Sequence, residues 1–322
     1  MSMLTLPDFK EKKLLFIQAE YPRDNVLQLI NDNIKFVRDG ETVNQMSTHS
    51  IFAVFIVGEM TITTALIKKL IAQGISIFFL NYNLRTRATI MSEAEGNFLL
   101  REKQYTCIKE ITIAGNIVLN KIDAQEATLK KAKKTYEAKI FENARAMLKK
   151  VSDNKQLLGV EGNVAKQYFQ VFFSDIGWVR RAPQTKEDIL NVLLDIGYTY
   201  LFNYCDSLLR LFGFDTYKGY YHQLFFQRQS LVCDVMEPMR PLIDYQLMKS
   251  YNLKQIKEKD FVFKNGRFDF KDGYKTSKIY SGIFLEAINS NKEQIYTYIL
   301  QFYRYIMNDA KYPFPVFTIK AE

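Results

Sequence analysis

The stretch IFAVFIVGEMTITTALIKKLIAQGISIFFL, residues 51–80, decides the fold class of the first part of the chain. Its first eight residues are almost wholly apolar and predict a buried strand. Apolar residues then recur at helical spacing: Ile62, Leu66, Ile67, Leu70 and Ile71. Gly74 stands where a glycine commonly ends a helix, and ISIFFL predicts a second strand. The pattern indicates a sheet with one crossing helix.

The segments around this stretch extend the prediction in both directions. Asp39-Gly40, inside NIKFVRDGETVNQM (33–46), predicts the turn of a β-hairpin. From Glu93 onward the patterns favour helices, and Thr185, after Pro183, is the expected N-cap of one of them. We therefore predict an α+β protein of two domains, a β-rich N-terminal domain (1–92) and an all-α C-terminal domain (93–322). Turn dipeptides at 265–266 and 272–273 predict an excursion from the helical body.

Composition narrows the classes of function. The chain has 322 residues, 48% of them hydrophobic, which is enough to fill a large core and argues against a disordered protein. Its net charge of +9 favours either a polyanionic partner or simple solubility. Between residues 121 and 155, ten Lys and Arg stand against five Asp and Glu, a pattern most often found on a solvated helix face.

Cysteine usage and targeting signals point to a reducing compartment. Cys107, Cys205 and Cys233 are odd in number and far apart, so they predict neither a disulfide framework nor a thiolate zinc site. The N-terminal residues lack the basic and apolar regions of a secretory signal, and no apolar run reaches membrane-spanning length. We expect a cytoplasmic protein with no membrane partner.

One carboxylate stands where an apolar residue would be expected. Glu161 falls on the apolar face of the helix predicted for NKQLLGVEGNVAKQYFQVFF (154–173), between Leu157 and Val164. An unpaired, ionised carboxylate facing a core costs several kcal/mol, so Glu161 needs a buried arginine, a proton or a metal ion. Gly162 beside it would let another backbone or a ligand come close.

A second group of candidates lies in GYYHQLFFQRQSLVCDVMEPMRPLID (219–244). His222 is one of only two histidines, and Asp234 and Glu237 stand three residues apart, so that both can project from one helical face. An imidazole with carboxylates and no thiolate suits Mg²⁺ or Mn²⁺ better than structural zinc. Spacing alone leaves two other interpretations open, a core histidine and a solvent-facing pair of acids.

Three motifs together resemble the CRISPR adaptation integrase, the CRISPR-associated endonuclease family that inserts new spacers. Residues 161–169 match its E-G-x-x-A-x-x-Y-F helix, and residues 188–198 match D-x-x-N-x-L-L-x-x-G-Y. Residues 222–241 match H-x(5)-R-x-S-L-x-x-D-x-x-E-x-x-R-P. The likeness spans roughly residues 30–245. The wording HQLFFQRQSLVCD also resembles integrases encoded beside type V single-effector systems.

The resemblance implies a site, a cofactor and a reaction. Glu161, His222 and Glu237 would be the catalytic metal ligands for Mg²⁺ or Mn²⁺, with Asp234, Arg228 and Tyr168 supporting them. The reaction would be transesterification, in which the 3′-hydroxyl of a prespacer DNA attacks a phosphodiester of the CRISPR repeat.

The same resemblance implies partners. The β-rich domain would form a homodimer and the helical domain would be catalytic. Two such dimers would flank a dimer of the small ferredoxin-like second adaptation protein, and the substrates would be double-stranded prespacer and repeat DNA.

Local chemistry is compatible with Glu237 as ligand and Asp234 as its support. Pro238 has no N–H, so the Asp234 carbonyl loses its usual helical partner and the chain there needs local hydrogen bonds. The Asp234 carboxylate could join these bonds and orient His222 or Arg228. Two other functions remain open, a metal-dependent nuclease acting on branched or single-stranded DNA, and a non-catalytic DNA-binding scaffold.

Overall fold

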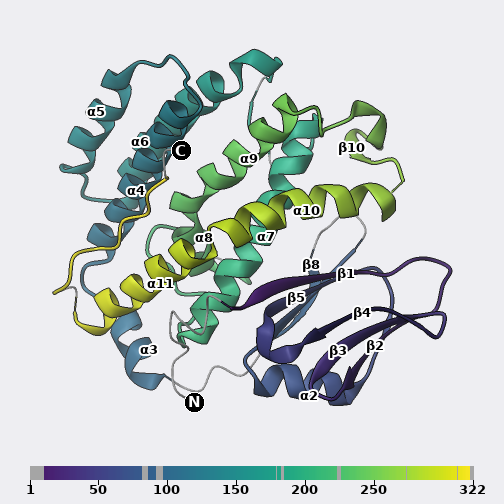
Figure 1. Ribbon diagram of the computed structural model, residues 1–322. Helices are drawn as coiled ribbons and strands as arrows, with labels where there is room; N and C mark the ends of the chain where they lie inside the picture. Colours follow the sequence, from purple (N-terminus) through teal and green to yellow (C-terminus); the bar gives the residue numbers. More distant parts are fainter. Residues whose placement is uncertain are drawn as a thin grey trace.

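Two four-stranded sheets form the N-terminal part of the molecule, and the rest is mostly helical (Figure 1). The computed structural model describes residues 11–81, 86–91, 97–178, 180–182, 185–222, 226–272, 274–309 and 311–319. The first sheet has the order β1-β5-β7-β8 and the second β4-β3-β2-β6. The strands are β1 (Lys13–Gln18), β2 (Asn25–Ile30), β3 (Asn33–Arg38), β4 (Glu41–Ser47), β5 (Ile51–Val57), β6 (Thr61–Ile62), β7 (Ser76–Leu80) and β8 (Thr86–Ile90).

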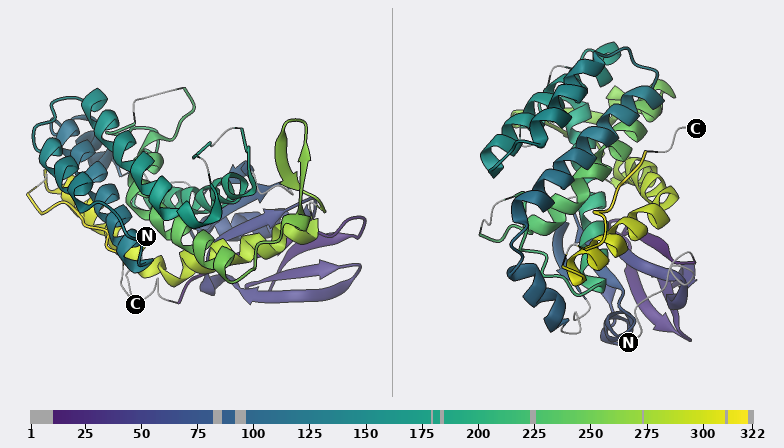
Figure 2. Two further views of the ribbon diagram at one scale, coloured as in Figure 1. Left: turned by 90° about the horizontal axis from the view of Figure 1, so that it is seen from above. Right: turned by 90° about the vertical axis from the view of Figure 1, so that its left-hand side faces the viewer.

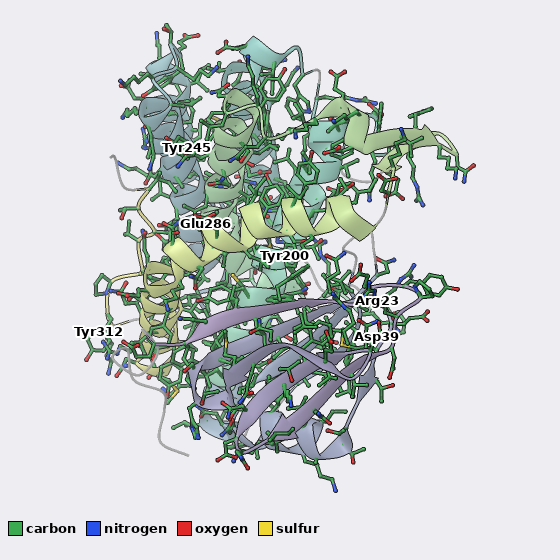
Figure 3. The ribbon with its side chains drawn as sticks, turned by 45° about the vertical axis from the view of Figure 1, so that its right-hand side comes forward. Arg23, Asp39, Tyr200, Tyr245, Glu286 and Tyr312 are labelled. Carbon is green, nitrogen blue, oxygen red and sulfur yellow. The ribbon has the colours of Figure 1, made fainter. Side chains whose placement is uncertain are left out.

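Strand β5 is buried on both faces because its sheet lies between two cores. Ile51, Val54 and Ile56 pack with the second sheet and with helix α2 (Thr64–Ala72). Phe55, from the opposite face, lies 5.2 Å from the Tyr200 ring in an edge-to-face contact. Figure 3 shows Tyr200 at the junction between the sheet and the helices. The apolar run that predicted a buried strand is therefore explained by the helical region, which covers one face of the sheet.

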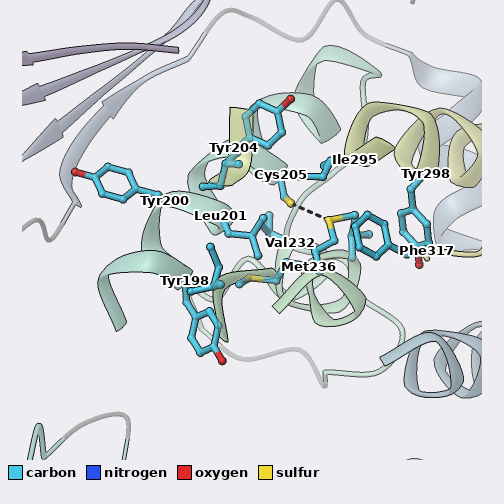
Figure 4. Close-up of a cluster of buried hydrophobic side chains, with 14 of the residues drawn as sticks. Tyr198, Tyr200, Leu201, Tyr204, Cys205, Val232, Met236, Ile295, Tyr298 and Phe317 are labelled. Atoms are coloured by element: carbon cyan, nitrogen blue, oxygen red, sulfur yellow. Dashed lines mark hydrogen bonds between the residues drawn. The ribbon is translucent and has the colours of Figure 1, made fainter. Parts of the chain in front are cut away.

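The helical region is built around one long, central helix, α7 (Ile189–Leu211), which is buried along most of its length. Figure 4 shows Leu201 and Cys205 of α7 facing Val232 and Met236, which come from the next helix along the chain. The remaining helices are α3 (Phe98–Tyr105), α4 (Glu110–Lys131), α5 (Ala138–Leu148), α6 (Asn154–Phe172), η2 (Ser174–Ile176), α8 (Ser230–Met236), η3 (Glu237–Met239), α9 (Arg240–Asn252), η4 (Glu258–Asp260), α10 (Tyr274–Ser290) and α11 (Lys292–Met307).

These helices spread away from the sheets, so the molecule is longer than it is wide (Figure 2). Helices α4, α5 and α6 lie together at the end remote from the strands, while α10 crosses toward β1. The segment 311–319 runs back along α4, where the Asn120 side chain donates to the carbonyl of Pro315 at 3.0 Å and accepts from the N–H of Phe317 at 2.9 Å. This end of the molecule carries α4 and α6, which supply two residues of the candidate site, Lys121 and Glu161.

The predicted fold class is confirmed, with two refinements. The N-terminal part has two sheets where the sequence predicted one, because β2, β3, β4 and β6 pair separately from the strands around β5. The helical part also contains a hairpin of β9 (Phe261–Lys264) and β10 (Arg267–Phe270). Its turn is Asn265-Gly266, one of the two predicted turn dipeptides, and both residues have positive φ.

The predicted N-cap at Thr185 is wrong by three residues. Helix α7 begins after Asp188, whose carboxylate accepts the N–H of Asn191 at 2.7 Å. Lys186 has a φ of 49°, a left-handed conformation that interrupts any helix starting at Thr185, whose hydroxyl bonds to Glu187 instead. Asp188 caps this helix because its short carboxylate reaches the orphan amides of the first turn.

Other predictions have mixed outcomes. The hairpin turn at Asp39-Gly40 and the glycine after the crossing helix are confirmed, and all three cysteines are free. The domain boundary between residues 92 and 93, Pro183 and the turn glycine Gly273 lie outside the described residues.

Candidate active site

Asp234 organises the loop that carries His222. Its carboxylate accepts the backbone N–H groups of Tyr220, Tyr221 and His222 at 2.6, 2.9 and 2.8 Å. Gly219 permits this approach, since a Cβ on it would lie 2.8 Å from Asp234 Oδ2. The side chain of Asp234, which is completely buried on α8, therefore anchors residues 219–222.

The same carboxylate fixes the histidine ring. Asp234 Oδ1 lies 2.7 Å from His222 Nδ1, and a carboxylate can only accept, so Nδ1 carries the proton. This leaves the lone pair of Nε2 free, and Nε2 lies 4.0 Å from Glu237 Oε1. The sequence expectation that Asp234 orients His222 agrees with this geometry, which is the arrangement that metal-binding histidines use.

Glu237 is positioned by an interruption in the helix. The Asp234 carbonyl accepts the Glu237 N–H at a three-residue step, and the short helix η3 starts there because Pro238 has no N–H. Glu237 is nearly completely buried, with Arg240 Nε at 3.0 Å from Oε1 and Lys121 Nζ at 2.6 Å from Oε2. Burial by itself raises the pKa of Glu237. The charges of Arg240 and Lys121, with His222, outweigh this effect and lower the pKa from 4.5 to about 2.

Glu161 reaches the same place from α6. Its Oε1 is in direct contact with Lys121 Nζ, and its side chain is 16% exposed. The sequence analysis offered Glu161 a buried arginine, a proton or a metal; the structure supplies a lysine from α4. Lys121 bridges two carboxylates that come from separate segments of the chain.

Lys121 is a site residue that sequence reasoning missed. The excess of lysines between 121 and 155 favoured a solvated helix face, and Lys121 is an exception, with a side chain only 11% exposed. A signal was present in the spacing, because Lys121 lies four residues after Ile117 and four before Gln125, both buried on the inner face of α4. The argument that marked Glu161 applies equally to this lysine.

Two of the three predicted ligands, Glu161 and Glu237, therefore meet at a cation supplied by the protein itself, and His222 lies beside Glu237. Within the described residues, no three His, Cys, Asp and Glu side chains cluster closely enough to hold a metal ion as they stand. The donor set nevertheless suits Mg²⁺ or Mn²⁺, with two carboxylates and an oriented imidazole. Glu237 Oε2 is buried and, although Lys121 is close, it accepts no well-directed hydrogen bond. Apart from the ion pair with Lys121, its lone pairs are available to a metal ion.

Arg228 and Tyr168, the other two predicted supporting residues, lie elsewhere. Arg228 is exposed in the loop before α8. Burial raises the pKa of the Cys233 thiol, and the guanidinium of Arg228 opposes part of this rise. The buried Tyr168 donates its hydroxyl to Asp244 at 3.0 Å. Two turns of α6 separate it from Glu161, so it supports the wall of the site rather than a ligand.

That wall is a network around Tyr198. The Tyr198 hydroxyl donates to Asp244 at 2.5 Å, and the guanidinium groups of Arg240 and Arg181 lie 4.7 and 5.3 Å from its ring centroid. Asp244 is fully buried, and burial raises its pKa to about 6 despite the two tyrosine hydroxyls and both arginines. Tyr198 thus lies against two cations, Arg240, which pairs with Glu237, and Arg181, which pairs with Asp195.

A cavity of about 530 Å³, the site cavity, opens next to Glu161. Its charged lining is mostly basic, comprising Lys121, Lys166, Arg180, Arg181 and Arg240 against Glu161 and Asp244. Gly162, Phe169 and Trp178 also line it. A second cavity, of about 600 Å³, shares Arg181, Tyr198 and Arg240 and extends to Arg87 on β8. Basic and aromatic side chains in such a hollow suit a nucleic-acid strand.

Tyr221 is a further residue at the carboxylates. Its hydroxyl is buried and, within the described part of the chain, neither donates nor accepts a well-formed hydrogen bond. Burial first, and then the charges of Glu161 and Glu237, raise the pKa of Tyr221. A phenol in this position is a hydrogen-bond donor facing the acidic group of the site.

Comparison with known proteins places this architecture in a family. The pattern of the family described as CRISPR associated protein Cas1 matches residues 22–279. The chain is 30% identical over 278 residues to the CRISPR-associated endonuclease Cas1 2 of Rhodospirillum rubrum, covering 78% of this chain and 80% of that protein. It is 27% identical over 257 residues to the CRISPR-associated endonuclease Cas1 1 of Thermodesulfovibrio yellowstonii, covering 74% and 81%. The chain belongs to the Cas1 family, a family of CRISPR-associated endonucleases.

Solved structures share the fold. A CAS1 protein from Thermotoga maritima superposes with a TM-score of 0.81 at 19% identity, over 96% of this chain and all of that one (100%). A casposase bound to integration product gives a TM-score of 0.80 at 18% identity, over 96% and 94%. None of the helices in the described residues is long and apolar enough to cross a membrane.

Proposed function

We propose that this protein is a metal-dependent DNA integrase of CRISPR adaptation. It would join the 3′-hydroxyl ends of prespacer DNA to the CRISPR repeat by transesterification. The observation that carries the proposal is the convergence of Glu161, Glu237 and an oriented His222 beside a basic cavity. Family membership and the shared fold with a casposase bound to integration product add support.

Glu161, His222 and Glu237 would hold Mg²⁺ or Mn²⁺. Bound there, the ion would supply the charge that activates the attacking hydroxyl and stabilises the leaving oxygen. Asp234 keeps the His222 Nε2 lone pair available by holding the Nδ1 proton. Arg181 and Arg240, fixed against Tyr198, would bind the phosphodiester, since guanidinium groups match phosphate oxygens.

The reaction needs no covalent enzyme intermediate. The 3′-oxygen of the incoming strand forms a bond to the phosphorus at the 5′ end of the repeat strand, as the bond between that phosphorus and the 3′-oxygen of the preceding nucleotide breaks. The proton of the attacking hydroxyl leaves, and the departing 3′-oxygen gains one, so that the number of phosphodiester bonds is conserved. The residues of the site therefore act by orienting two strands and balancing charge.

Incubating prespacer with repeat DNA in Mg²⁺ or Mn²⁺ tests the proposal, with products resolved on a denaturing gel. We expect joined strands from a prespacer with a 3′-hydroxyl and none from one ending in a 3′-deoxy sugar. Cleavage without joining would instead mean a nuclease that uses the same residues with water. DNA binding with neither product would mean a non-catalytic scaffold.

The partners follow from the same proposal. We expect a homodimer through the β-rich domain, assembly with a small ferredoxin-like second adaptation protein, and a cytoplasmic location. Light scattering of the protein alone and with that second protein measures the assembly. DNA affinity should fall steeply with salt, with a log–log slope near −0.9 for each phosphate contacted, whereas charges serving only solubility predict a flat curve.

The system of origin is a finer proposal. The segment HQLFFQRQSLVCD (222–234) supports a type V single-effector system. Sequencing the neighbouring genes tests this, and a multi-subunit effector beside the repeats would contradict it.

A further inference from the structure

Lys121 occupies the centre of the acidic group. Its ammonium contacts Glu161 Oε1 and lies 2.6 Å from Glu237 Oε2. The lysine projects from α4, while the two carboxylates come from α6 and η3, so one side chain joins three segments of the chain. These are the same two carboxylates that would hold a divalent cation.

A lysine whose side chain is only 11% exposed needs a reason to be there. Its ammonium is paired with a carboxylate on each of two segments, Glu161 on α6 and Glu237 on η3. Without it, two carboxylates would face each other in a site where both are largely hidden from water, and they would repel. Arg240 neutralises Glu237 from the other side, which leaves two cations against two anions.

We propose that Lys121 is a built-in counter-cation, which holds Glu161 and Glu237 in ligand geometry and is displaced when a divalent metal binds between them. The inference rests on the ligand set of the proposed function. Lys121 is a positioning residue in this scheme, because it acts through the two carboxylates. The ammonium and the metal compete for Glu161 Oε1 and Glu237 Oε2, and their like charges exclude both from remaining close together.

The structure provides a place for the displaced ammonium. Lys121 lines the site cavity of about 530 Å³, which also holds Lys166, Arg180 and Arg181. A lysine carries its charge on a flexible four-carbon stem, so a change of rotamer moves the ammonium without moving the helix. Metal binding would thus transfer a positive charge from the carboxylates to the cavity proposed to bind phosphate, and would couple the two events.

The competition sets the expected sign of a substitution. Lys121→Met removes the competing charge, so the two carboxylates should bind Mn²⁺ more tightly, by about tenfold or more given the strength of charge interactions at a few ångströms. The metal-free variant should melt at a lower temperature than the parent because the carboxylates repel. Saturating Mn²⁺ should stabilise the variant more than the parent and close most of that gap.

Titration calorimetry with Mn²⁺, together with melting curves in EDTA and in Mn²⁺, measures these effects on the full chain. Lys166→Met is the matched control, since Lys166 lines the same cavity and makes no ion pair with either carboxylate in the described residues. We expect its Mn²⁺ affinity to stay within twofold of the parent. Lys121→Gln, which is polar and closer to lysine in solubility, replaces Lys121→Met if the latter does not fold.

The outcomes separate the inference from the function. Tighter Mn²⁺ binding by the Lys121 variant, with the control unchanged, supports the inference. Equal or weaker binding overturns it and leaves the ligand set standing. If the parent protein binds no Mn²⁺ while still joining DNA strands, the ligand set itself is wrong, and the inference falls with it.

Discussion

The two regions of the molecule differ in where they bury charge. In the described part of the β-rich region the buried polar side chains are Gln18, Asn25, Thr48 and Ser76, none of them charged. In the helical region the buried side chains include the charged residues Glu126, Lys186, Asp206, Asp234, Glu237 and Asp244. Buried charge costs stability unless paired, so its concentration marks the region shaped for chemistry rather than for stability. The contrast predicts that substitutions in the two regions have different consequences.

The largest effect should follow from Glu237→Ala. Strand joining should fall to background and Mn²⁺ binding should be lost, because the side chain is the most buried of the proposed ligands and carries two ion pairs. The metal-free protein should also lose about 3–5 kcal/mol, since Arg240 loses its partner inside the protein. Gel assays, calorimetry and denaturant unfolding measure the three effects.

Two variants serve as references for that result. Glu237→Gln keeps the shape of the side chain and tests the chemistry if the alanine variant is too unstable. Glu286→Ala removes an exposed carboxylate on α10, at the position labelled in Figure 3, and should change nothing. Wild-type joining by Glu237→Gln would contradict the role of Glu237 as a ligand.

A substitution in the apolar core between the two sheets should act on stability alone. Leu70 on α2 is completely buried there, and Leu70→Ala should destabilise the protein by about 2–5 kcal/mol. The Mn²⁺ affinity of the folded fraction, measured by calorimetry well below the melting temperature, should stay at the parent value. A tenfold loss of affinity would show that the two regions are coupled more tightly than their separate cores suggest.

The pH dependence of stability should expose the buried charge of Asp244. Because its pKa is raised from 3.8 to about 6 in the folded protein, folding takes up a proton between these values. Asp244 therefore makes the protein less stable as pH rises from about 4 to 6, by about 3 kcal/mol in all.

Asp244→Asn isolates this effect from the other carboxylates. The difference in unfolding free energy between Asp244→Asn and the parent, taken from urea curves at each pH, should change across the window and level off above pH 6. The comparison with the parent is needed because Glu237 changes stability in the opposite direction. Its pKa is lowered from 4.5 to about 2, so its contribution to stability is lost as pH falls below 4.5. A difference that stays constant from pH 4 to 7 would contradict a raised pKa.

Asp234→Asn should have a smaller effect than loss of a ligand. Its amide can accept fewer bonds from residues 220–222 and cannot hold the His222 ring in the same way. We expect Mn²⁺ binding to remain measurable and to weaken about 10–100-fold, with joining slowed to a similar degree. If Asp234→Asn binds no metal while Glu237→Ala binds normally, the two acids have exchanged roles.

The smallest effect should come from Gly162→Ala. A Cβ on Gly162 would meet no atom within 4 Å, so the protein's own packing does not require glycine there, and alanine should stabilise α6 by about 0.5–1 kcal/mol. Gly162 lines the site cavity, so the added methyl group should reduce DNA joining while the melting temperature rises. Gly197→Ala is the contrast, because its Cβ would lie 2.9 Å from Phe284 and destabilise the core. Unchanged joining by Gly162→Ala would mean that DNA does not approach this turn.

The sequence by itself determined the elements and the key acids. Strand, helix and turn signals in residues 33–80 depend on neighbours in the chain, which is why the hairpin and the crossing helix could be predicted. Glu161 was identified by its conflict with an apolar face. The family resemblance gave Asp234 its supporting role, with which the nearby Pro238 is compatible, and its hydrogen bonds to His222 agree. The predicted ligand roles themselves stay predictions.

Only the tertiary structure decided which groups meet. Lys121, Glu161 and Glu237 are 40 and 76 residues apart along the chain, and their contact depends on how α4, α6 and η3 pack. Tertiary packing also divides the strands into two sheets. It brings Arg181 and Arg240 together against Tyr198. Local propensity acts over a few residues, whereas the position of a buried charge is fixed by partners from distant segments, whose attraction depends on distance in space.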